Sequence, residues 1–222
     1  MKIVFVDVDK TLVAKSTAIL ALKYFVKRGY AGWKLIILSI VFSILHYLNL
    51  ADPKRMVQLG LEPFVGHSHS KIKRDMDIVF ERHIQPLIYC DALDAINKHK
   101  NDGDLVLLLT STSFDLAAPI ARYLDIDYIA AEAVIENDTY TAIVVDPIPY
   151  GEGKLEHARR VCEEKGVGLE DCYFYTDSSS DMPLLEKVGH PKIVNPDPRL
   201  LREAKKRDWE ILRFEKTLKD CA

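Results

Sequence analysis

The sequence is poor in cysteine, and its cysteines form no C-x-x-C pair. Cys90, Cys162, Cys172 and Cys221 are scattered along 222 residues. Structural zinc sites need closely spaced Cys or His ligands, and small secreted domains need a dense set of disulfides. The spacing therefore argues against a zinc site and a disulfide framework, and it is typical of a protein in a reducing compartment.

Charge is missing from one long stretch of the chain. No Asp, Glu, Lys or Arg occurs in the 17 residues from Leu35 to Ala51. That length is a little short for a comfortable span of a ~30 Å hydrocarbon layer. The few polar residues recur every three or four positions, so they form one stripe of a helix. Segment 33–50 therefore has three alternatives: a helix buried in a helical domain, an interfacial membrane helix, or a true span.

Positive and negative charges are unevenly divided along the chain. Residues 14–88 carry 11 Lys and Arg against 5 Asp and Glu, whereas the rest carries 19 against 28. A basic segment suits an anionic substrate or an anionic membrane surface, although a solvated helical surface explains any single lysine equally well. Met1 leads into an apolar run without a signal-like leader, so we expect a cytoplasmic protein, either free or peripheral at the inner membrane face.

That first apolar run is the most informative stretch of the sequence. Ile3 to Val6 are mostly β-branched or aromatic and lead directly to Asp7, with Asp9 two positions later. A continuous run of this kind is typical of a strand buried in a parallel sheet. In an extended chain both carboxylates would point the same way, which is unfavourable unless a cation or a proton lies between them. A simple turn after a strand is the alternative interpretation.

Strands and helices alternate over the rest of the chain, apart from an all-helical insertion. We expect helices over 16–28, 54–61, 69–85, 91–100, 113–124, 153–165, 181–188 and 197–206, and strands over 105–109, 129–131, 173–175, 192–194 and 209–212. Segments 134–135 and 140–145 flank Asn137-Asp138 as a β-hairpin. This order predicts an α/β fold with a doubly wound, Rossmann-like parallel sheet, interrupted by helical residues 14–88.

Polar side chains gather at the ends of these elements. Thr110 and Ser111 end one strand, Lys154 lies just inside a helix, and Asp177 ends another strand with Asp181 four residues later. Each of them alone is most simply a cap, a turn or a surface residue. With DVDKT, however, they resemble the four ordered motifs of the haloacid dehalogenase (HAD) superfamily of phosphohydrolases, in order, strand context and spacing.

The resemblance is greatest to the phosphoserine-phosphatase-like branch, subfamily IB, and it extends over nearly the whole chain. It implies a catalytic core formed by residues 1–13 and 89–222, with a helical cap at 14–88 inserted between the first and second motifs. It also implies a phosphatase that works through an aspartyl-phosphate, with Asp7 as nucleophile and Asp9 as general acid and base.

The same resemblance implies a Mg²⁺ site and a phosphate site. Asp7, the backbone carbonyl of Asp9 and Asp177 would supply oxygen ligands, which Mg²⁺ prefers. Asp181 would hold a metal-bound water or Lys154. The remaining contacts would go to the phosphoryl oxygens: the Thr110 hydroxyl, the amides of Ser111 and Thr112, and the Lys154 ammonium.

The sequence departs from the phosphoserine phosphatases at Ser16, where those enzymes usually have a Glu that holds the substrate ammonium, and at Lys10, where a small or aromatic residue is usual. A neutral Ser cannot offset the desolvation of an ammonium group, so phosphoserine is not the expected substrate. The apolar segment and basic cap resemble a subgroup that includes phosphatases of lipid phosphates, which makes an amphipathic phosphomonoester and cap contact with an anionic membrane one hypothesis.

Two other functions remain open on the sequence alone. The first is a soluble phosphatase of small metabolites such as phosphoserine, histidinol phosphate or a sugar phosphate. The second, from another class, is a non-catalytic phosphate-binding protein. We expect no nucleic-acid partner, and the sequence leaves the oligomeric state open.

Overall fold

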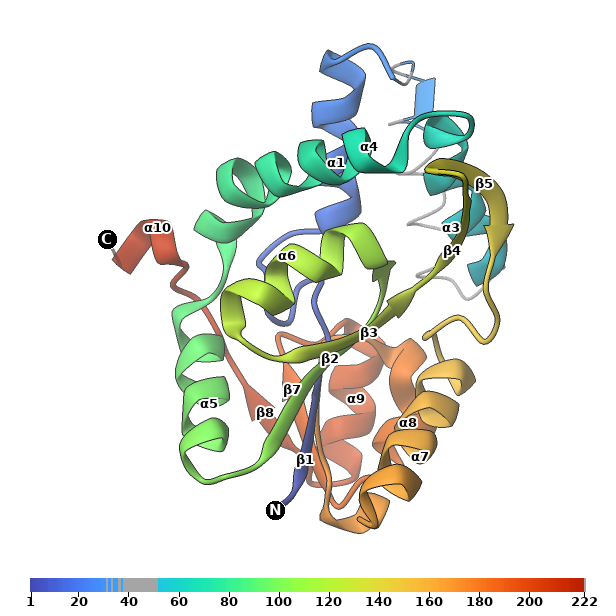
Figure 1. Ribbon diagram of the computed structural model, residues 1–222. Coiled ribbons are helices and arrows are strands. Elements are labelled where there is room, and N and C mark those ends of the chain that lie inside the picture. The colour runs from blue at the N-terminus through green and yellow to red at the C-terminus, as the bar shows by residue number, and fades with distance from the viewer. Residues whose placement is uncertain (31, 33, 36, 38–51, 222) are drawn as a thin grey trace.

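The computed structural model describes residues 1–30, 32, 34–35, 37 and 52–221, and its centre is a six-stranded parallel sheet with the strand order β3-β2-β1-β6-β7-β8 (Figure 1). The strands are β1 (Ile3–Val6), β2 (Leu105–Ser113), β3 (Asp127–Ala131), β6 (Tyr173–Thr176), β7 (His190–Val194) and β8 (Glu210–Leu212). The chain proceeds outward from β1 through β2 to β3 and then resumes at β6 on the other side of β1. In such sheets ligands bind outside the carboxyl ends of the strands at this switch point.

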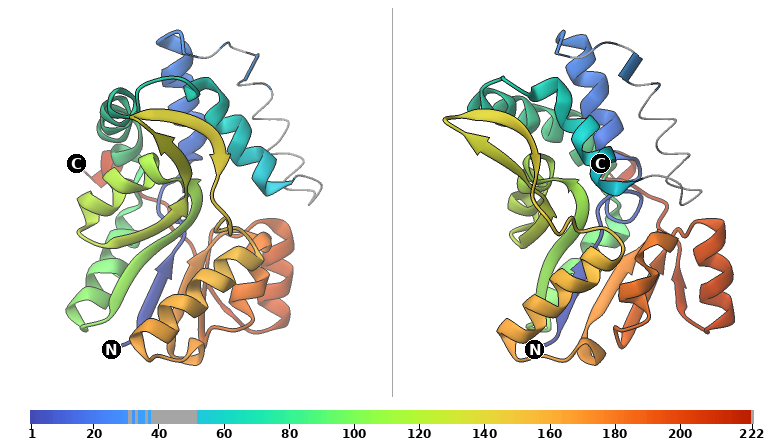
Figure 2. Two further views of the ribbon diagram at one scale, coloured as in Figure 1. Left: turned by 45° about the vertical axis from the view of Figure 1, so that its right-hand side comes forward. Right: turned by 90° about the vertical axis from the view of Figure 1, so that its right-hand side faces the viewer.

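Side chains of β1 alternate between the two faces of the sheet, and each face is covered by helices (Figure 2). Val4 and Val6 contribute to a cluster with α5 (Cys90–Asn101) and α6 (Phe114–Leu124). Ile3 and Phe5 contribute to a second cluster with α7 (Glu152–Lys165), α8 (Met182–Leu185) and α9 (Pro198–Lys206). The predicted doubly wound parallel sheet is therefore confirmed, and its continuous apolar run reflects burial on both faces.

Helices also fill the described part of the predicted insertion. They are α1 (Thr17–Lys27), α3 (Pro53–Leu61), the 3₁₀ turn η1 (Glu62–Phe64) and α4 (His69–Val79). The helix predicted over 69–85 ends early, because α4 gives way to a π-helical turn η2 (Phe80–Ile84) and a 3₁₀ turn η3 (Gln85–Leu87). Pro86 within η3 has no amide hydrogen with which to continue α-helical bonding.

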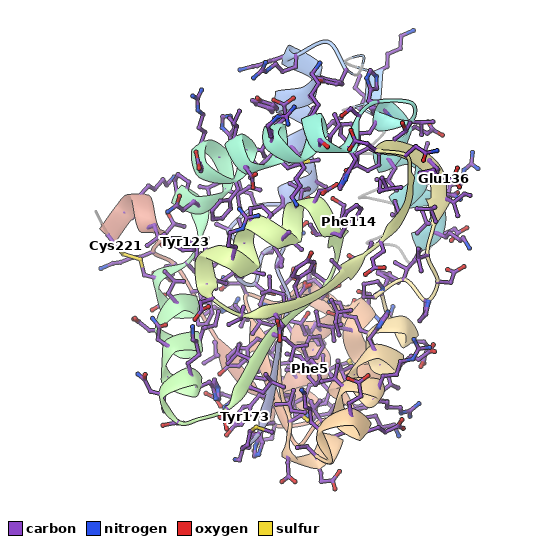
Figure 3. All side chains as sticks on the ribbon, in the orientation of Figure 1. Phe5, Phe114, Tyr123, Glu136, Tyr173 and Cys221 are labelled. Atoms are coloured by element: carbon purple, nitrogen blue, oxygen red, sulfur yellow. A yellow bond between two sulfur atoms is a disulfide. The ribbon has the colours of Figure 1, made fainter. Side chains whose placement is uncertain are left out.

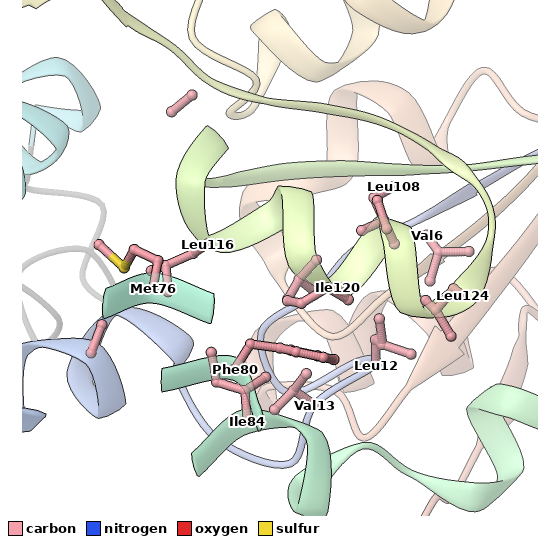
Figure 4. Close-up of a cluster of buried hydrophobic side chains, with 14 of the residues drawn as sticks. Val6, Leu12, Val13, Met76, Phe80, Ile84, Leu108, Leu116, Ile120 and Leu124 are labelled. Carbon is pink, nitrogen blue, oxygen red and sulfur yellow. The ribbon is translucent and has the colours of Figure 1, made fainter. Parts of the chain in front are cut away.

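One hydrophobic cluster joins these helices to the sheet. Met76 and Phe80 pack with Leu116 and Ile120 of α6 in the same buried cluster as Val6 of β1 (Figure 4). The chain leaves the sheet region at Val13 and returns at Ile88, and these two residues form an antiparallel bridge. The two connections between the predicted core and the predicted cap therefore lie side by side.

A small antiparallel sheet outside the main one confirms the predicted hairpin. Its strands are β4 (Ala133–Glu136) and β5 (Thr139–Val144). Asp138 in the turn accepts hydrogen bonds from the hydroxyls of Ser68 (2.7 Å) and Ser70 (2.6 Å) at the start of α4. The hairpin is thus attached to the N-terminal end of α4, where Figure 1 shows the two elements side by side.

Other expectations need correction. β2 continues to Ser113 rather than ending at residue 109, and the helix predicted over 181–188 is reduced to a 3₁₀ turn η5 (Ser179–Asp181) followed by the short α8. The structure also joins Cys90 to Cys221 in a disulfide near the C-terminus, which the spacing of the cysteines did not predict (Figure 3). Two cysteines 131 residues apart carry no local signal of pairing.

The predicted apolar helix over 33–50 lies almost entirely outside the described residues. Within the part of the chain that the structure does describe, no helix has both the length and the apolar character needed to cross a membrane.

Candidate active site

Three of the predicted site residues lie at or near the carboxyl ends of neighbouring strands. Asp7 directly follows β1, Thr110 lies in β2, and Asp177 directly follows β6. The Asp7 amide donates to the Tyr175 carbonyl of β6 at 3.0 Å, which fixes the first carboxylate against the neighbouring strand. All three residues are nearly inaccessible, with 7 %, 1 % and 7 % of their surface exposed. The site thus lies at the switch point of the sheet.

A buried lysine joins two of the carboxylates. Lys154, from the first turn of α7, places Nζ 3.0 Å from Asp7 Oδ1 and 2.7 Å from Asp181 Oδ2. Burial alone would lower the pKa of Lys154, but the charges of Asp181 and Asp7 raise it above its ordinary value, so the ammonium persists. Thr176 Oγ1 donates to the same Asp181 oxygen at 2.6 Å. Of the two partners that the sequence allowed for Asp181, the structure therefore shows Lys154.

Negative charge nevertheless exceeds positive charge in this volume. Burial raises the pKa of Asp7 to about 6, and the charges of Asp181 and Asp9 act in the same direction against the opposing effect of Lys154. Burial, followed by the charge of Asp7, raises the pKa of Asp177 well above its ordinary value. Buried carboxylates that repel one another in this way favour a bound cation or proton.

The donor set fits a Mg²⁺ ion. Among the described residues no group of three or more His, Cys, Asp and Glu side chains is suited to a metal. The expected ligands, however, are only two carboxylates, from Asp7 and Asp177, together with the backbone carbonyl of Asp9. Asp181 Oδ1 is buried without a hydrogen-bond partner in the described structure, as an acceptor reserved for a metal-bound water would be. Oxygen ligands with remaining positions for water are what Mg²⁺ requires.

The backbone around Asp9 has a conformation that the sequence did not predict. The chain does not stay extended after Asp7 but turns, with the amides of Leu12 and Val13 bonded to the Val8 carbonyl. Lys10 lies in the left-handed region at φ 58°, a backbone conformation that non-glycine residues rarely adopt. The charge of Asp9 contributes to the raised pKa of Asp7, after the effects of burial and of the charge of Asp181.

The Thr112 amide, which was expected to contact the phosphoryl group, already has a partner in the structure. The Thr112 amide donates to Thr110 Oγ1 at 3.2 Å, so it is already engaged rather than free for a phosphoryl group. Because that bond uses a lone pair of Thr110 Oγ1, the hydroxyl hydrogen of Thr110 remains available as a donor. Ser111, which precedes Thr112, is exposed.

Sequence reasoning missed Thr17 and the side chain of Thr112. Both side chains are buried, and Thr17 donates from its amide (2.9 Å) and its hydroxyl (2.6 Å) to Asp9 Oδ1. The sequence indicated only a helix start at residues 16–17, and Ser16 makes no capping bond through its side chain. A threonine ten positions after a candidate nucleophile carries no signal by itself.

Known proteins with similar sequences and known structures with a similar fold were found for this chain. A probable phosphatase of Mycobacterium tuberculosis (strain H37Rv) is 32% identical over 96% of this chain and 75% of its own length. A protein of the same organism named phosphoserine phosphatase is 30% identical over 95% of this chain and 70% of its own length. A crystal structure of a protein of unknown function from Bordetella pertussis Tohama I has a TM-score of 0.86 at 25% identity, over 95% of this chain and 97% of that one.

A phospho-aspartyl intermediate analogue of phosphoserine phosphatase has the same fold, with a TM-score of 0.71 at 16% identity over 97% of this chain and 94% of that one. The profile of one family, described as haloacid dehalogenase-like hydrolase, matches residues 4–186, which include every candidate catalytic residue. The resemblance seen in the ordered motifs is thereby confirmed: this chain belongs to the haloacid dehalogenase-like hydrolase family.

Proposed function

We propose that this protein is a Mg²⁺-dependent phosphomonoester hydrolase in which Asp7 is transiently phosphorylated. The observation that carries the proposal is the buried Asp7 carboxylate, which the Lys154 ammonium holds at 3.0 Å at the carboxyl end of β1. A carboxylate needs no base to become a nucleophile at neutral pH. The assignment of residues 14–88 as cap, and of 1–13 with 89–222 as catalytic core, is part of the same proposal.

The first step transfers the phosphoryl group to the protein. An Asp7 oxygen attacks phosphorus, the bond from phosphorus to the substrate oxygen breaks, and the Asp9 carboxyl gives its proton to the leaving alkoxide. Burial raises the pKa of Asp9, although bonds from Thr17 oppose the shift, so Asp9 can carry that proton. Thr110 and Lys154 donate to the phosphoryl oxygens, where the charge of the transition state is spread.

The second step restores the enzyme. Asp9, now a carboxylate, removes a proton from water as that water attacks phosphorus, and the bond between phosphorus and Asp7 breaks to release phosphate. Mg²⁺ bound through Asp7, Asp177 and the Asp9 carbonyl would supply positive charge to the phosphoryl oxygens in both steps. Asp181 holds the Lys154 ammonium in position throughout.

Two observations bear on the substrate. Relatives include proteins named phosphoserine phosphatase and histidinol-phosphatase, which supports a phosphate ester of a small metabolite. Ser16 offers no carboxylate to an ammonium group, which argues for an alcohol portion without one. The lipid hypothesis depended on segment 33–50, and it stays a prediction, as do a cytoplasmic location and contact with the inner membrane face.

The proposal is tested by Asp7→Asn, with Asp102→Asn on the exposed end of α5 as the matched control. We expect Mg²⁺-dependent hydrolysis of p-nitrophenyl phosphate by the unmodified chain and by the control, inhibition of both by EDTA, and no hydrolysis by Asp7→Asn. Mass spectrometry after an acid quench should find a phosphoryl group on Asp7. Equal rates for Asp7→Asn and the control would overturn the proposal, and phosphate binding without hydrolysis would favour the non-catalytic alternative.

The substrate class is tested in parallel with a panel of phosphoserine, histidinol phosphate, a sugar phosphate and a lysophosphatidate, with and without anionic vesicles. A preference for a soluble ester without an ammonium group is the expected result. A clear preference for phosphoserine would contradict the argument from Ser16. Faster hydrolysis of the lysophosphatidate in the presence of vesicles would support the lipid hypothesis.

A further inference from the structure

Thr17 occupies an unusual position for a polar residue. It is the first residue of α1 in the predicted cap, yet its side chain is 0 % exposed. Its amide nitrogen lies 2.9 Å and its Oγ1 2.6 Å from the same atom, Asp9 Oδ1. Two donors from one residue therefore converge on a single oxygen of the proposed general acid.

The direction of the adjoining hydrogen bonds follows from counting hydrogens. Oδ1 of Asp9 is the acceptor, so the single hydroxyl hydrogen of Thr17 is committed to it. Thr112 Oγ1 lies 3.1 Å from Thr17 Oγ1 and must therefore be the donor of that pair. The result is a directed chain of hydroxyls from the end of β2 through α1 to Asp9.

This arrangement distinguishes the two oxygens of the Asp9 carboxyl. Oδ1 accepts both bonds from Thr17 and cannot also carry a proton that points at its donors, so the proton belongs on Oδ2. Two hydrogen bonds to one oxygen restrict the rotation of the carboxyl group about its Cβ–Cγ bond.

We propose that Thr17 is a positioning residue that orients Asp9 so that Oδ2 faces the oxygen of the leaving group. The inference rests on the proposed function and deepens it. In the first step the proton moves from Oδ2 to the leaving oxygen as the phosphorus–oxygen bond breaks, and Oδ1 keeps its two bonds to Thr17. Because Thr17 belongs to α1, protonation of the leaving group depends on a residue of the predicted cap.

The test exploits the different need of two leaving groups for a proton. Nitrophenolate departs with little protonation, whereas the alkoxide of glycerol phosphate requires it, and kcat/KM reports the steps up to release of the alcohol. For Thr17→Val we expect kcat/KM to fall at least about tenfold further with glycerol phosphate than with p-nitrophenyl phosphate. Thr17→Ser, which retains the hydroxyl, should restore the ratio.

Thr217→Val is the matched control. Thr217 also donates from its amide (3.0 Å) and its hydroxyl (2.7 Å) to one carboxylate oxygen, Asp220 Oδ2, but near the C-terminus and away from the site. It should leave the ratio of the two kcat/KM values unchanged. If Thr17→Val does not fold, Thr112→Val tests the same chain of hydroxyls and should shift the ratio in the same direction by less.

Equal losses with both substrates, or no loss with either, would overturn the role of Thr17 while leaving the proposed function intact. Failure of the proposed function would look different, because Asp7→Asn and the unmodified chain would then hydrolyse both substrates equally.

Discussion

Two clusters of largely buried polar side chains lie against the sheet, one at its carboxyl end and one that reaches the amino end of β2. The first, here called the catalytic cluster, consists of Asp7, Lys154, Asp177 and Asp181. The second, here called the amino-end cluster, consists of His99, Asp104 and Tyr175, with Asp104 directly before β2. Each combines at least one carboxylate with polar partners from other elements, so the presence of polar groups does not by itself distinguish them.

Satisfaction of hydrogen bonds does distinguish them. In the amino-end cluster, His99 Nδ1 lies 2.9 Å from Asp104 Oδ2, and its Nε2 lies 3.0 Å from the Tyr175 hydroxyl. The remaining Asp104 oxygen accepts from the Lys2 amide at 2.9 Å. In the catalytic cluster, Asp181 Oδ1 has no partner in the described structure and the pKa values of two carboxyls are raised. An unpartnered buried oxygen and raised carboxyl pKa values, rather than polar residues as such, indicate where a ligand binds.

The largest expected effect comes from removing the Lys154 ammonium from the catalytic cluster. Lys154→Met leaves Asp7 and Asp181 buried and unpaired, so the free energy of unfolding in EDTA should fall by about 3–5 kcal/mol. Hydrolysis should fall by about 10²–10³-fold, because Lys154 also stabilises the transferring phosphoryl group. Urea unfolding and p-nitrophenyl phosphate assays measure the two losses. Lys165→Met, on the exposed end of the same helix, is the control, and a matching result for both variants would contradict the comparison.

Mg²⁺ should stabilise the catalytic cluster and have no effect on the amino-end cluster. A ligand that binds only the folded state adds about 2.7 kcal/mol at a concentration a hundred times its Kd. We therefore expect thermal unfolding to shift upward with Mg²⁺ for the unmodified chain, and Asp177→Asn to abolish most of the shift. Tyr175→Phe should retain the full shift. Equal Mg²⁺ responses of the two variants would mean that the cation binds elsewhere.

Tyr175→Phe should in turn affect stability but not activity. The substitution leaves His99 Nε2 buried without its partner, at an expected cost of about 1–2 kcal/mol in the free energy of unfolding. Burial raises the pKa of Tyr175 to about 12, so the lost group is a neutral hydroxyl. Tyr123→Phe, at an exposed tyrosine, is the control for urea unfolding. A loss of kcat in Tyr175→Phe at unchanged stability would assign the amino-end cluster to catalysis and remove the distinction.

Sequence patterns anticipated the sheet and the catalytic cluster, but not the bonds that orient its members. Apolar runs ending in Asp7 and Asp177 predicted the strands that precede them, because buried parallel strands have a strong compositional signal. The turn after Asp7 was not predicted, because Lys10 adopts a left-handed conformation and lysine is not a residue type that indicates one. The prediction that an extended chain points Asp7 and Asp9 the same way was therefore wrong, because the chain turns after Asp7.

Contacts between distant segments had no sequence signal at all. His99, Asp104 and Tyr175 belong to α5, the turn after it and β6, and only the tertiary fold brings them together. The disulfide between Cys90 and Cys221 is a second example. In both cases the sequence separation hides the partner, whereas the strand-end motifs could be found because sheet topology brings all strand ends to one edge.

The smallest effect expected is a difference in the pH dependence of stability. Burial opposes ionisation of Asp104, but the bonds from His99 and the Lys2 amide and the nearby positive charges together lower its pKa. A carboxyl whose pKa is lowered on folding contributes stability above its unfolded pKa of about 3.9, and loses that contribution as the pH falls through the folded value. The unmodified chain should therefore lose stability below about pH 4 more steeply than Asp104→Asn.

Urea unfolding between pH 3 and pH 7 in EDTA measures that difference, with Asp102→Asn as a neighbouring control whose profile should follow the unmodified chain. Parallel profiles for Asp104→Asn and the unmodified chain would show that Asp104 gains nothing from its partners on folding. The amino-end cluster would then be as poorly satisfied as the catalytic one, and hydrogen-bond satisfaction would no longer separate a structural cluster from a site prepared for a ligand.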